Sequence, residues 1–335
     1  MTRRQRTRDA IARRQPDKCP HNVELTGEAM KLFCDFAGIK KEAFPAFAEN
    51  HIDKLGFNGG AEIAPGFFRD EFSVVWNRTG IDKDIGVVEK LLLEGADASA
   101  LVLPEVDAED IGKRSAAFLA KPTDTFKLAK IGMLLFERAW SLRGMETLLM
   151  DMVEEEAFVE ALFETITDYN VRIVNEALKH DFDGFYFGDD YGQQQGMIMG
   201  PALWRKFIKP CLARTFEPIK RKGLPVMLHS CGDIGPVLPD LIDIGLDVYQ
   251  TVQPEIYDLE RLKRDYGADL CFYGAVSTQR DMAFAKPEEL KAIVRKTIGT
   301  LSQSGGYICA PTHQVQADVP PENVMAMLET LKGNP

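Results

Sequence analysis

From about residue 147 onward, apolar positions switch between two spacings, which predicts alternating helices and strands. Helical spacing runs through 147–180, and a second helix is expected over 201–222, between Pro201 and Gly223. Short apolar runs, typical of buried strands, end near residues 187, 228, 251, 273 and 309. The helices expected between and after them cover 235–244, 257–266 and 287–303.

Three upstream segments bring the number of expected strands to eight. Residues 131–136 form a good candidate, whereas 21–25 and 72–76 are weaker ones. Eight is the number at which a parallel sheet alternating with helices closes into a barrel. We therefore predict an α/β fold, a single (β/α)8 barrel of the TIM type over residues 1–335, with an N-terminal helical extension. The stretch 80–130 is less regular, and extra helices or a lid are expected there.

Composition narrows the classes of function. The chain has 335 residues and a formal net charge of −11, which argues against non-specific nucleic-acid binding. Six arginines lie within the first 14 residues, where a surface helix is a better interpretation than a transit peptide. No apolar stretch is long enough to span a bilayer, and no secretory signal is present, so a cytoplasmic location is expected. The six cysteines are expected to be reduced, and some are free to bind metal.

The side chains at the expected strand ends suggest chemistry. In barrels of this type the active site lies at the carboxyl ends of the strands. Those ends carry acids, amides, imidazoles and thiols: Glu137, Asp189, Asp190, His229, Cys231, Gln253, Glu255, Cys309 and His313. Acids in such loops also cap the following helix, and this alternative stays open for Asp189, Asp190 and Glu255.

His229 and Cys231 are two residues apart at a strand end, a spacing that places both on one side. Cys309 lies at the end of a later strand, which in a barrel faces the same mouth. One imidazole and two thiolates are a donor set that suits zinc. A fourth position left for substrate or an exchangeable carboxylate would be typical of a catalytic site. A core pair or a capping residue is the alternative for an isolated His-x-Cys.

Three segments carry a resemblance to a known family. They are Met227-Leu228-His229-Ser230-Cys231-Gly232, Phe187-Gly188-Asp189-Asp190 and the stretch from Gly306 to His313. They resemble the uroporphyrinogen decarboxylase superfamily, and within it the zinc methyltransferases that work with corrinoid proteins. The resemblance is good from about residue 130 to the end. It implies His229, Cys231 and Cys309 as zinc ligands, with Glu255 as a displaceable fourth.

The resemblance also implies the reaction. The expected activity is transfer of a methyl group between a corrinoid (cobalamin), carried by a partner corrinoid protein, and an oxygen or sulfur atom of a small molecule. O-demethylation of a methyl ether is one form of it. Glu137, Asp189 and His313 are candidates for proton transfer or ligand orientation, and Asp190, Tyr186 and Gln253 for substrate binding.

Uroporphyrinogen decarboxylase itself is the alternative within the superfamily. Its arginine-rich motif after the first helix is missing here. Asp70 lies near the position of the aspartate that the decarboxylase uses, but the residues next to Asp70 in the sequence are different. A substrate with many carboxylates should not enter a mouth lined by Glu137, Asp189 and Glu255 without compensating cations. A non-catalytic metal-binding barrel is the remaining alternative, because a fold does not determine a function.

Overall fold

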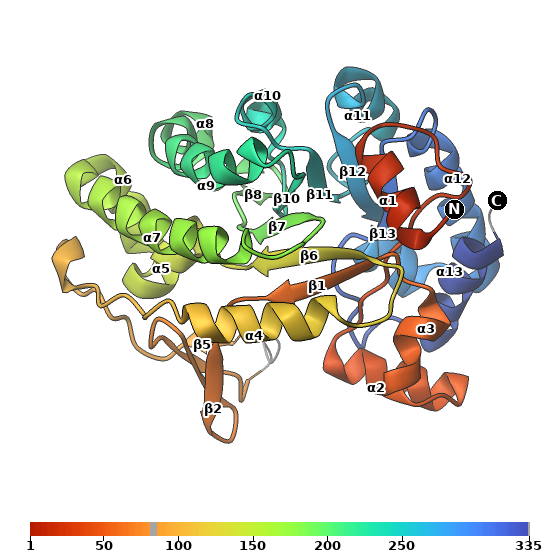
Figure 1. The fold of residues 1–335 in the computed structure, drawn as a ribbon, viewed down its shortest axis with the longest axis horizontal. Coiled ribbons are helices and arrows are strands. Elements are labelled where there is room, and N and C mark those ends of the chain that lie inside the picture. The colour runs from red at the N-terminus through yellow and green to blue at the C-terminus, as the bar shows by residue number, and fades with distance from the viewer. Residues whose placement is uncertain (81–85, 334–335) are drawn as a thin grey trace.

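The computed structural model describes residues 1–80 and 86–333. Its main sheet has seven parallel strands in the order β1-β6-β7-β10-β11-β12-β13 and curls into a barrel (Figure 1). The strands are β1 (Ile52–Gly56), β6 (Phe126–Ile131), β7 (Gly184–Gly188), β10 (Val226–His229), β11 (Val248–Val252), β12 (Cys271–Val276) and β13 (Tyr307–Pro311).

The segment 21–25 occupies the eighth position of the barrel. The backbone N–H of Asn22 donates to the carbonyl of Cys309 (3.0 Å), and isolated parallel bridges join the segment to β13 and the loop after it. On the other side, the N–H of His51, just before β1, donates to the carbonyl of His21 (3.0 Å). The chain therefore folds as the predicted TIM-type barrel, although its eighth strand is only partly regular.

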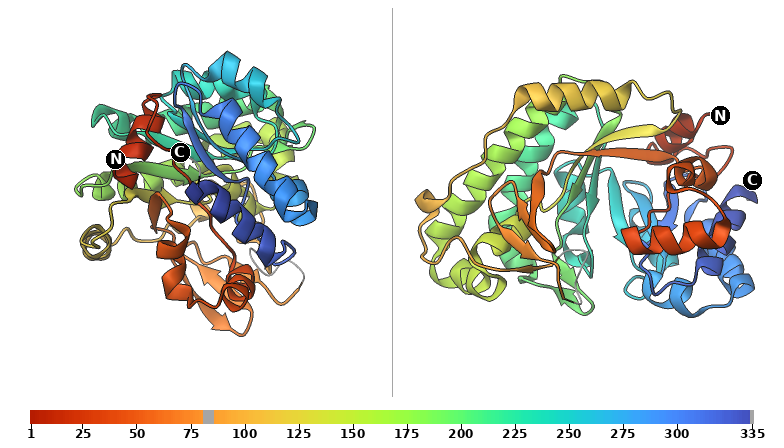
Figure 2. Two further views of the ribbon diagram at one scale, coloured as in Figure 1. Left: turned by 90° about the vertical axis from the view of Figure 1, so that its right-hand side faces the viewer. Right: turned by 90° about the horizontal axis from the view of Figure 1, so that it is seen from below.

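Helices pack around the outside of the barrel (Figure 2). After segment 21–25 come α2 (Gly27–Ala37) and α3 (Phe44–Ala48), and α4 (Ala108–Leu119) precedes β6. The helices that follow β6 are α5 (Phe136–Arg143), α6 (Met145–Glu154) and α7 (Glu156–Ala177). Those after the later strands are α8 (Gly200–Leu203), α9 (Lys209–Arg221), α10 (Leu238–Asp243), α11 (Leu259–Tyr266), α12 (Pro287–Leu301) and α13 (Pro321–Gly333). A search of the described helices finds none with the length and apolar character needed to cross a membrane.

Two of the expected strands are placed differently. Residues 72–76 do not join the barrel, because β4 (Val75–Asn77) belongs to a small antiparallel sheet with β2 (Gly60–Ala64), β3 (Phe67–Asp70) and β5 (Val87–Val88). The barrel strand of that region is β1 instead. The strand expected over 131–136 lies five residues earlier, as β6, and α5 begins at Phe136. The small sheet projects from the barrel below α4 (Figure 1).

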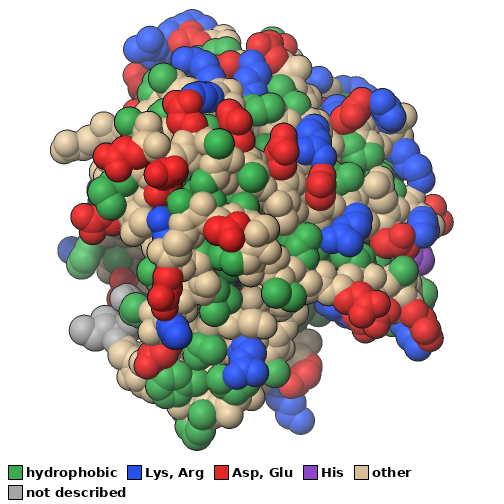
Figure 3. Space-filling view, turned by 90° about the vertical axis from the view of Figure 1, so that its left-hand side faces the viewer, with side chains coloured by type: hydrophobic (Ala, Val, Ile, Leu, Met, Phe, Trp, Pro, Cys, Tyr) green, Lys and Arg blue, Asp and Glu red, His purple; other side chains and the backbone are tan. Residues whose placement is uncertain are grey.

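The small sheet also forms part of an outer surface of mixed charge. On the face drawn in Figure 3, Lys and Arg side chains alternate with Asp and Glu, and no large field of one sign is visible. Ile63 and Val87 of the small sheet are exposed apolar side chains. A face of this kind is unlike the basic surface of a nucleic-acid-binding protein.

The predicted N-terminal helix, α1 (Arg3–Ile11), covers the amino-terminal end of the barrel rather than lying only on the surface. Ala10 and Ile11 belong to the apolar cluster inside the barrel, together with Ile52 and Met227. Arg4 and Arg8 each form an ion pair with the buried Asp183 (2.7 and 3.1 Å). The arginines of this segment thus face the end of the barrel opposite to the strand carboxyl ends.

Candidate functional site

His229 ends β10 with its side chain facing the barrel interior, like that of Met227 two residues before. β10 pairs with β11 so that His229 stands opposite Gln250, and His229 Nδ1 lies within hydrogen-bonding distance of Gln250 Oε1. A carbonyl oxygen only accepts, so Nδ1 carries the proton and Nε2 keeps its lone pair. Nε2 lies 3.4 Å from the Sγ atom of Cys231.

The loop that carries Cys231 is fixed by hydrogen bonds on several sides. Its N–H donates to Asp190 Oδ1 (2.8 Å), and its carbonyl accepts from the N–H of Gly192 (3.2 Å). The N–H of Gly232 donates to Gln253 Oε1 (2.7 Å). Gly232 has φ +79°, and a Cβ atom there would lie 2.1 Å from the carbonyl carbon of Gly192. Only glycine fits this approach to the hairpin of β8 (Gly192–Gln193) and β9 (Gly196–Met197).

His313, in the loop after β13, completes a set of three candidate ligands. One donor atom each from His229, Cys231 and His313 lie within 4.8 Å of one another. Two imidazole nitrogens and one sulfur are zinc ligands, and zinc–ligand bonds of about 2.0–2.3 Å need only a small contraction of this set. The hydrogen bond from His229 Nδ1 is the orientation usual for a metal-binding histidine. The donor types and their spacing therefore fit zinc.

The structure corrects the position of Cys309. It lies inside β13 rather than at its end, and its side chain packs in the outer core with Tyr307 and Cys19. Its neighbours Ile308 and Ala310 face the barrel interior. Strand alternation therefore points the Cys309 thiol away from His229, and burial raises its pKa to about 12.

Glu255 is also separate from the three candidate ligands. It lies exposed in the loop after β11, where the Ser277 hydroxyl donates to its carboxylate. This hydrogen bond ties Glu255 to the loop after β12. Glu255 does not belong to the cluster of His229, Cys231 and His313, and it does not line the cavity of the barrel mouth that contains His229 and His313.

Asp189 caps a helix, but not the following helix that the capping alternative expected; it caps α5, which precedes β7 in the chain. Its carboxylate accepts the N–H groups of Leu135, Phe136 and Glu137 (2.8–3.1 Å) at the start of α5, and its side chain is fully buried. Burial raises its pKa to about 7. Asp189 therefore positions Glu137 and does not reach the cavity, whereas Asp190 lines the cavity and lies 3.5 Å from His229 Nε2.

Glu137 lies in the first turn of α5 and borders two cavities. Burial, together with the charges of Asp190 and Asp189, raises the pKa of Glu137 well above its usual range. One cavity, of about 200 Å³, is the inner cavity of the barrel mouth, which also contains His229, His313 and Asp190. The other, the outer cavity of about 870 Å³, lies between the barrel and the small sheet. Lys130, Gly132, Met133 and Glu137 line both, so the two cavities adjoin there.

The inner cavity holds charged residues that sequence reasoning missed. Lys54 forms an ion pair with Glu24 (2.7 Å), and the ammonium groups of Lys54 and Lys130 lie 4.7 and 5.8 Å from the ring centre of Tyr186. The Tyr186 hydroxyl donates to Gln250 Oε1 (2.7 Å). Tyr186 therefore lines the cavity, and its hydroxyl orients Gln250. The signal available in the sequence was a lysine next to apolar residues in a strand segment, at Lys54 and Lys130.

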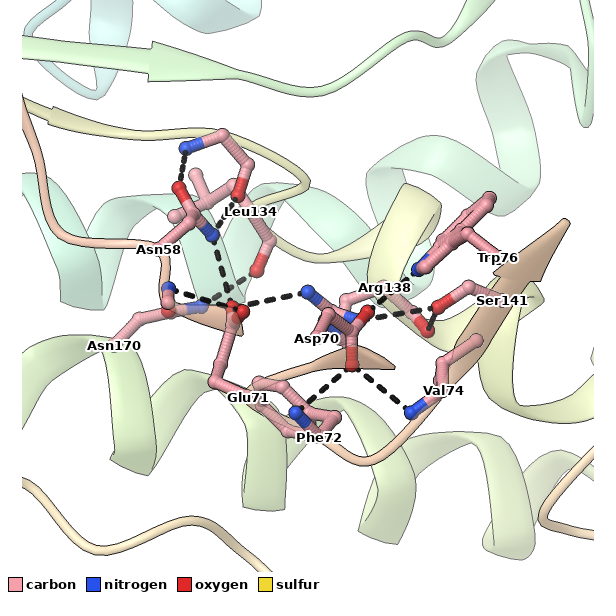
Figure 4. Close-up of polar contacts among 12 residues, drawn as sticks. Asn58, Asp70, Glu71, Phe72, Val74, Trp76, Leu134, Arg138, Ser141 and Asn170 are labelled. Carbon is pink, nitrogen blue, oxygen red and sulfur yellow. Dashed lines mark hydrogen bonds and ion pairs between the residues drawn. The ribbon is translucent and has the colours of Figure 1, made fainter. Parts of the chain in front are cut away.

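Arg138 and Asp70 form a buried network under the outer cavity (Figure 4). Arg138 bonds Asp70 (2.6 Å) and Glu71 (3.0 Å) and stacks over Phe72 (4.3 Å). Asp70 also accepts from the indole of Trp76 (2.9 Å) and from the N–H groups of Phe72 and Val74. Every strong acceptor direction of the Asp70 carboxylate is therefore used inside the protein.

Glu71 extends this network toward the mouth (Figure 4). It accepts from Asn58 Nδ2 (3.0 Å), and the Asn58 amide makes two hydrogen bonds with the backbone of Gly132 (2.7 and 2.9 Å). Because Gly132 lines both cavities, the small sheet is coupled to the wall of the inner cavity.

A protein-family model and two curated proteins match the sequence of this chain. The family model described as uroporphyrinogen decarboxylase (URO-D) matches residues 136–333, more than half of the chain. Two uroporphyrinogen decarboxylases from strains of Thermus thermophilus are each 24% identical over 189 residues, which cover 54% of this chain and 50% of theirs. The chain thus spans about half the length of the curated relatives it matches.

A solved structure covers nearly the whole chain. The structure described as a methyltransferase from Methanosarcina mazei matches with a TM-score of 0.73 at 16% identity, over 99% of this chain and 98% of that one. At this identity the match shows a shared fold. The match of the family model extends from α5 through every later strand of the barrel to α13, and the chain belongs to the uroporphyrinogen decarboxylase family.

Proposed function

We propose that this chain is a zinc-dependent methyltransferase that moves a methyl group between a corrinoid, carried by a partner protein, and an oxygen or sulfur atom of a small molecule. The observation that carries the proposal is the group of His229, Cys231 and His313 at the barrel mouth. Membership of the family and the fold shared with a methyltransferase support it.

His229 Nε2, Cys231 Sγ and an imidazole nitrogen of His313 would hold the zinc. When bound, zinc supplies Lewis acidity that makes a thiol more acidic or an ether oxygen a better leaving group. Gln250 keeps the His229 ring in the tautomer with a free Nε2, and Tyr186 holds Gln250 in place. Asp190 fixes the Cys231 backbone beside them.

Glu137 is the proton donor of this proposal. Burial and the neighbouring charges of Asp190 and Asp189 raise the pKa of Glu137 and so favour the protonated form of its carboxyl group, which borders the inner cavity. When a methyl ether loses its methyl group, the alkoxide or phenoxide that leaves takes up such a proton, whereas a thiolate that accepts a methyl group needs none. A substrate oxygen in the inner cavity lies between Glu137 and the histidines that line the same space.

The curated relatives favour uroporphyrinogen decarboxylation as a second candidate. Two features argue against it. Asp70, near the position of the decarboxylase aspartate, is saturated by Arg138, Trp76 and two backbone N–H groups. The arginines of α1 lie at the opposite end of the barrel, where Arg4 and Arg8 pair with Asp183.

The deciding experiment measures both reactions on the zinc-loaded protein. Methylcobalamin with thiols, and Co(I) cobalamin with methoxylated aromatics, are followed by the cobalt spectrum. We expect methyl transfer in one of these pairs and its loss in His229→Ala. Formation of coproporphyrinogen from uroporphyrinogen, undiminished by His229→Ala, would contradict the proposal and favour the decarboxylase.

A further inference from the structure

A third cavity, of about 580 Å³, adjoins the candidate zinc ligands and is lined by Cys231 and His313. Six of the eleven glutamines of the chain line it: Gln193, Gln194, Gln253, Gln279, Gln314 and Gln316. They come from the loops after four different barrel strands, β7, β11, β12 and β13. We call this cavity the glutamine groove. Such a concentration of one residue type at a single place is not explained by loop polarity alone.

Most of these amides are free to bind a ligand. Gln253 is engaged with the N–H of Gly232, but the other five side chains make no hydrogen bond within the described chain. Thr251 also lines the groove, and its hydroxyl is buried without a hydrogen-bond partner among the residues described. A buried hydroxyl without a partner costs free energy unless a ligand or water satisfies it.

The charge of the groove restricts the ligand. Among the described residues that line it, none is Lys or Arg, and Asp318 is the one acid. Each glutamine offers two donors and an acceptor, which match neutral amides in both directions. A ligand edge rich in carboxylates would find no cation there and would be repelled by a chain of net charge −11. The groove therefore suits an edge that carries neutral amides.

We propose that the glutamine groove binds the amide-bearing edge of the corrin ring, whose periphery carries acetamide and propionamide side chains. This assignment rests on the proposed function. The groove and the inner cavity share His313 and Gln314, so the candidate zinc ligands stand between them. The corrinoid reaches these ligands from the groove, and the small substrate reaches them from the inner cavity. The two reactants thus approach through two different cavities.

The test measures binding without turnover. The Kd of the whole zinc-loaded protein is measured by equilibrium dialysis for cobinamide, and for cobyrinic acid, in which the same side chains are carboxylates. We expect cobinamide to bind about tenfold or more tightly than cobyrinic acid. Gln279→Met/Gln316→Met removes two amides at nearly constant side-chain length and should weaken cobinamide binding by about tenfold, the loss expected for two neutral hydrogen bonds.

Two controls separate this assignment from the rest of the proposal. Gln303→Met removes an exposed glutamine that bonds Gly299 outside the groove, and it should leave the Kd unchanged. Zinc content should be the same in all variants. Equal Kd values for cobinamide and cobyrinic acid, an unaltered Kd in the double variant, or no saturable binding would overturn the groove assignment. Amide-dependent binding in a protein that holds no zinc would instead contradict the proposed metal chemistry and leave the groove assignment standing.

Discussion

At the scale of the residue, Gln250 connects the candidate zinc ligand His229 with Tyr186 of the inner cavity. Its Oε1 atom meets both His229 Nδ1 and the Tyr186 hydroxyl, and its side chain is 7% exposed. Without this acceptor, the His229 ring would be free to rotate or to take the other tautomer. Partners of this kind orient the ligands of metal sites and affect metal affinity almost as strongly as the ligands themselves.

Gln250→Leu removes the acceptor and should lower zinc affinity by about 10–100-fold. Gln250→Glu keeps an acceptor at the same place and should retain zinc, whereas Tyr186→Phe, which removes only the second donor, should change zinc affinity little. Competition with a chromogenic chelator measures all three. Zinc affinity of the wild-type level in Gln250→Leu would show that His229 is not oriented in this way.

The sequence predicted two of the three clustered side chains, His229 and Cys231, as metal ligands, and it placed the third, His313, at the same mouth as a candidate for proton transfer or ligand orientation. His229 and Cys231 were recognisable because a strand ends there, and residues two apart point to the same side of the sheet. Cys309 was predicted as the third ligand at a strand end, whereas β13 continues to Pro311. Alternation then turns Cys309 outward, and the loop after the strand carries His313 to the mouth. Glu137 and Asp190 were correctly placed at the mouth, but the capping role of Asp189 required coordinates.

At the scale of the element, the β8–β9 hairpin holds the loop of Cys231. The Asp233 N–H donates to the Gln193 carbonyl (2.9 Å), and the Gly192 N–H donates to the Cys231 carbonyl (3.2 Å). The two backbones approach so closely that Gly232 and Gly192 leave no room for a side chain. The position of the thiol therefore depends on this contact between two loops.

Gly232→Ala should displace the Cys231 loop, because the new methyl group would meet the Gly192 backbone at 2.1 Å. We expect zinc affinity to fall at least tenfold, as for loss of a supporting contact. Gly223→Ala is the matched control, since Gly223 has a similar positive φ of +69° with open space around it. The control should lose only about 1 kcal/mol of stability and keep its zinc. Urea unfolding and zinc titration test both, and equal zinc affinities would refute the argument.

The later strands, which are mostly apolar, were predicted well. The ends of β7, β10, β11 and β13 lie within two residues of the expected bounds, and β12 runs three residues past its expected end. β1 was missed because Asp53 and Lys54 interrupt its apolar pattern, yet Lys54 faces the polar mouth of the barrel. Lys127 and Lys130 likewise interrupt the apolar pattern of β6, which was expected five residues further along the chain. Lys54 and Lys130 line the inner cavity, so two of the residues that interrupt the apolar pattern belong to the candidate site.

At the scale of the whole molecule, the barrel is closed at one end by α1 and along one side by segment 21–25. His21 of this segment packs its ring edge-on against His51 at a centroid distance of 4.5 Å, and both rings are buried. Burial lowers the pKa of His21 to about 4 and that of His51 to about 2. Both are therefore neutral in the folded protein, while their pKa in the unfolded chain is about 6.5.

This pair makes the closure of the barrel sensitive to acid. Below pH 6.5 the unfolded chain binds two more protons than the folded one at these positions, so stability is lost as the pH falls toward about 4. The free energy of unfolding then falls by up to about 2.7 kcal/mol per pH unit. Urea unfolding of the wild type and of His21→Gln/His51→Gln at pH 7 and pH 5 isolates the contribution. The wild type should lose about 3–4 kcal/mol more than the variant, and equal losses would contradict the assigned protonation states.

The central claim is that His229, Cys231 and His313 bind one zinc at the barrel mouth. The most direct measurement is zinc K-edge X-ray absorption of the metal-loaded protein, with the number of sulfur neighbours as the result. We predict one sulfur at about 2.3 Å and at least two nitrogen neighbours at about 2.0–2.1 Å, with the sulfur lost in Cys231→Ser and retained in Cys309→Ser. Two sulfur neighbours, or a protein that holds no zinc at all, would contradict the account.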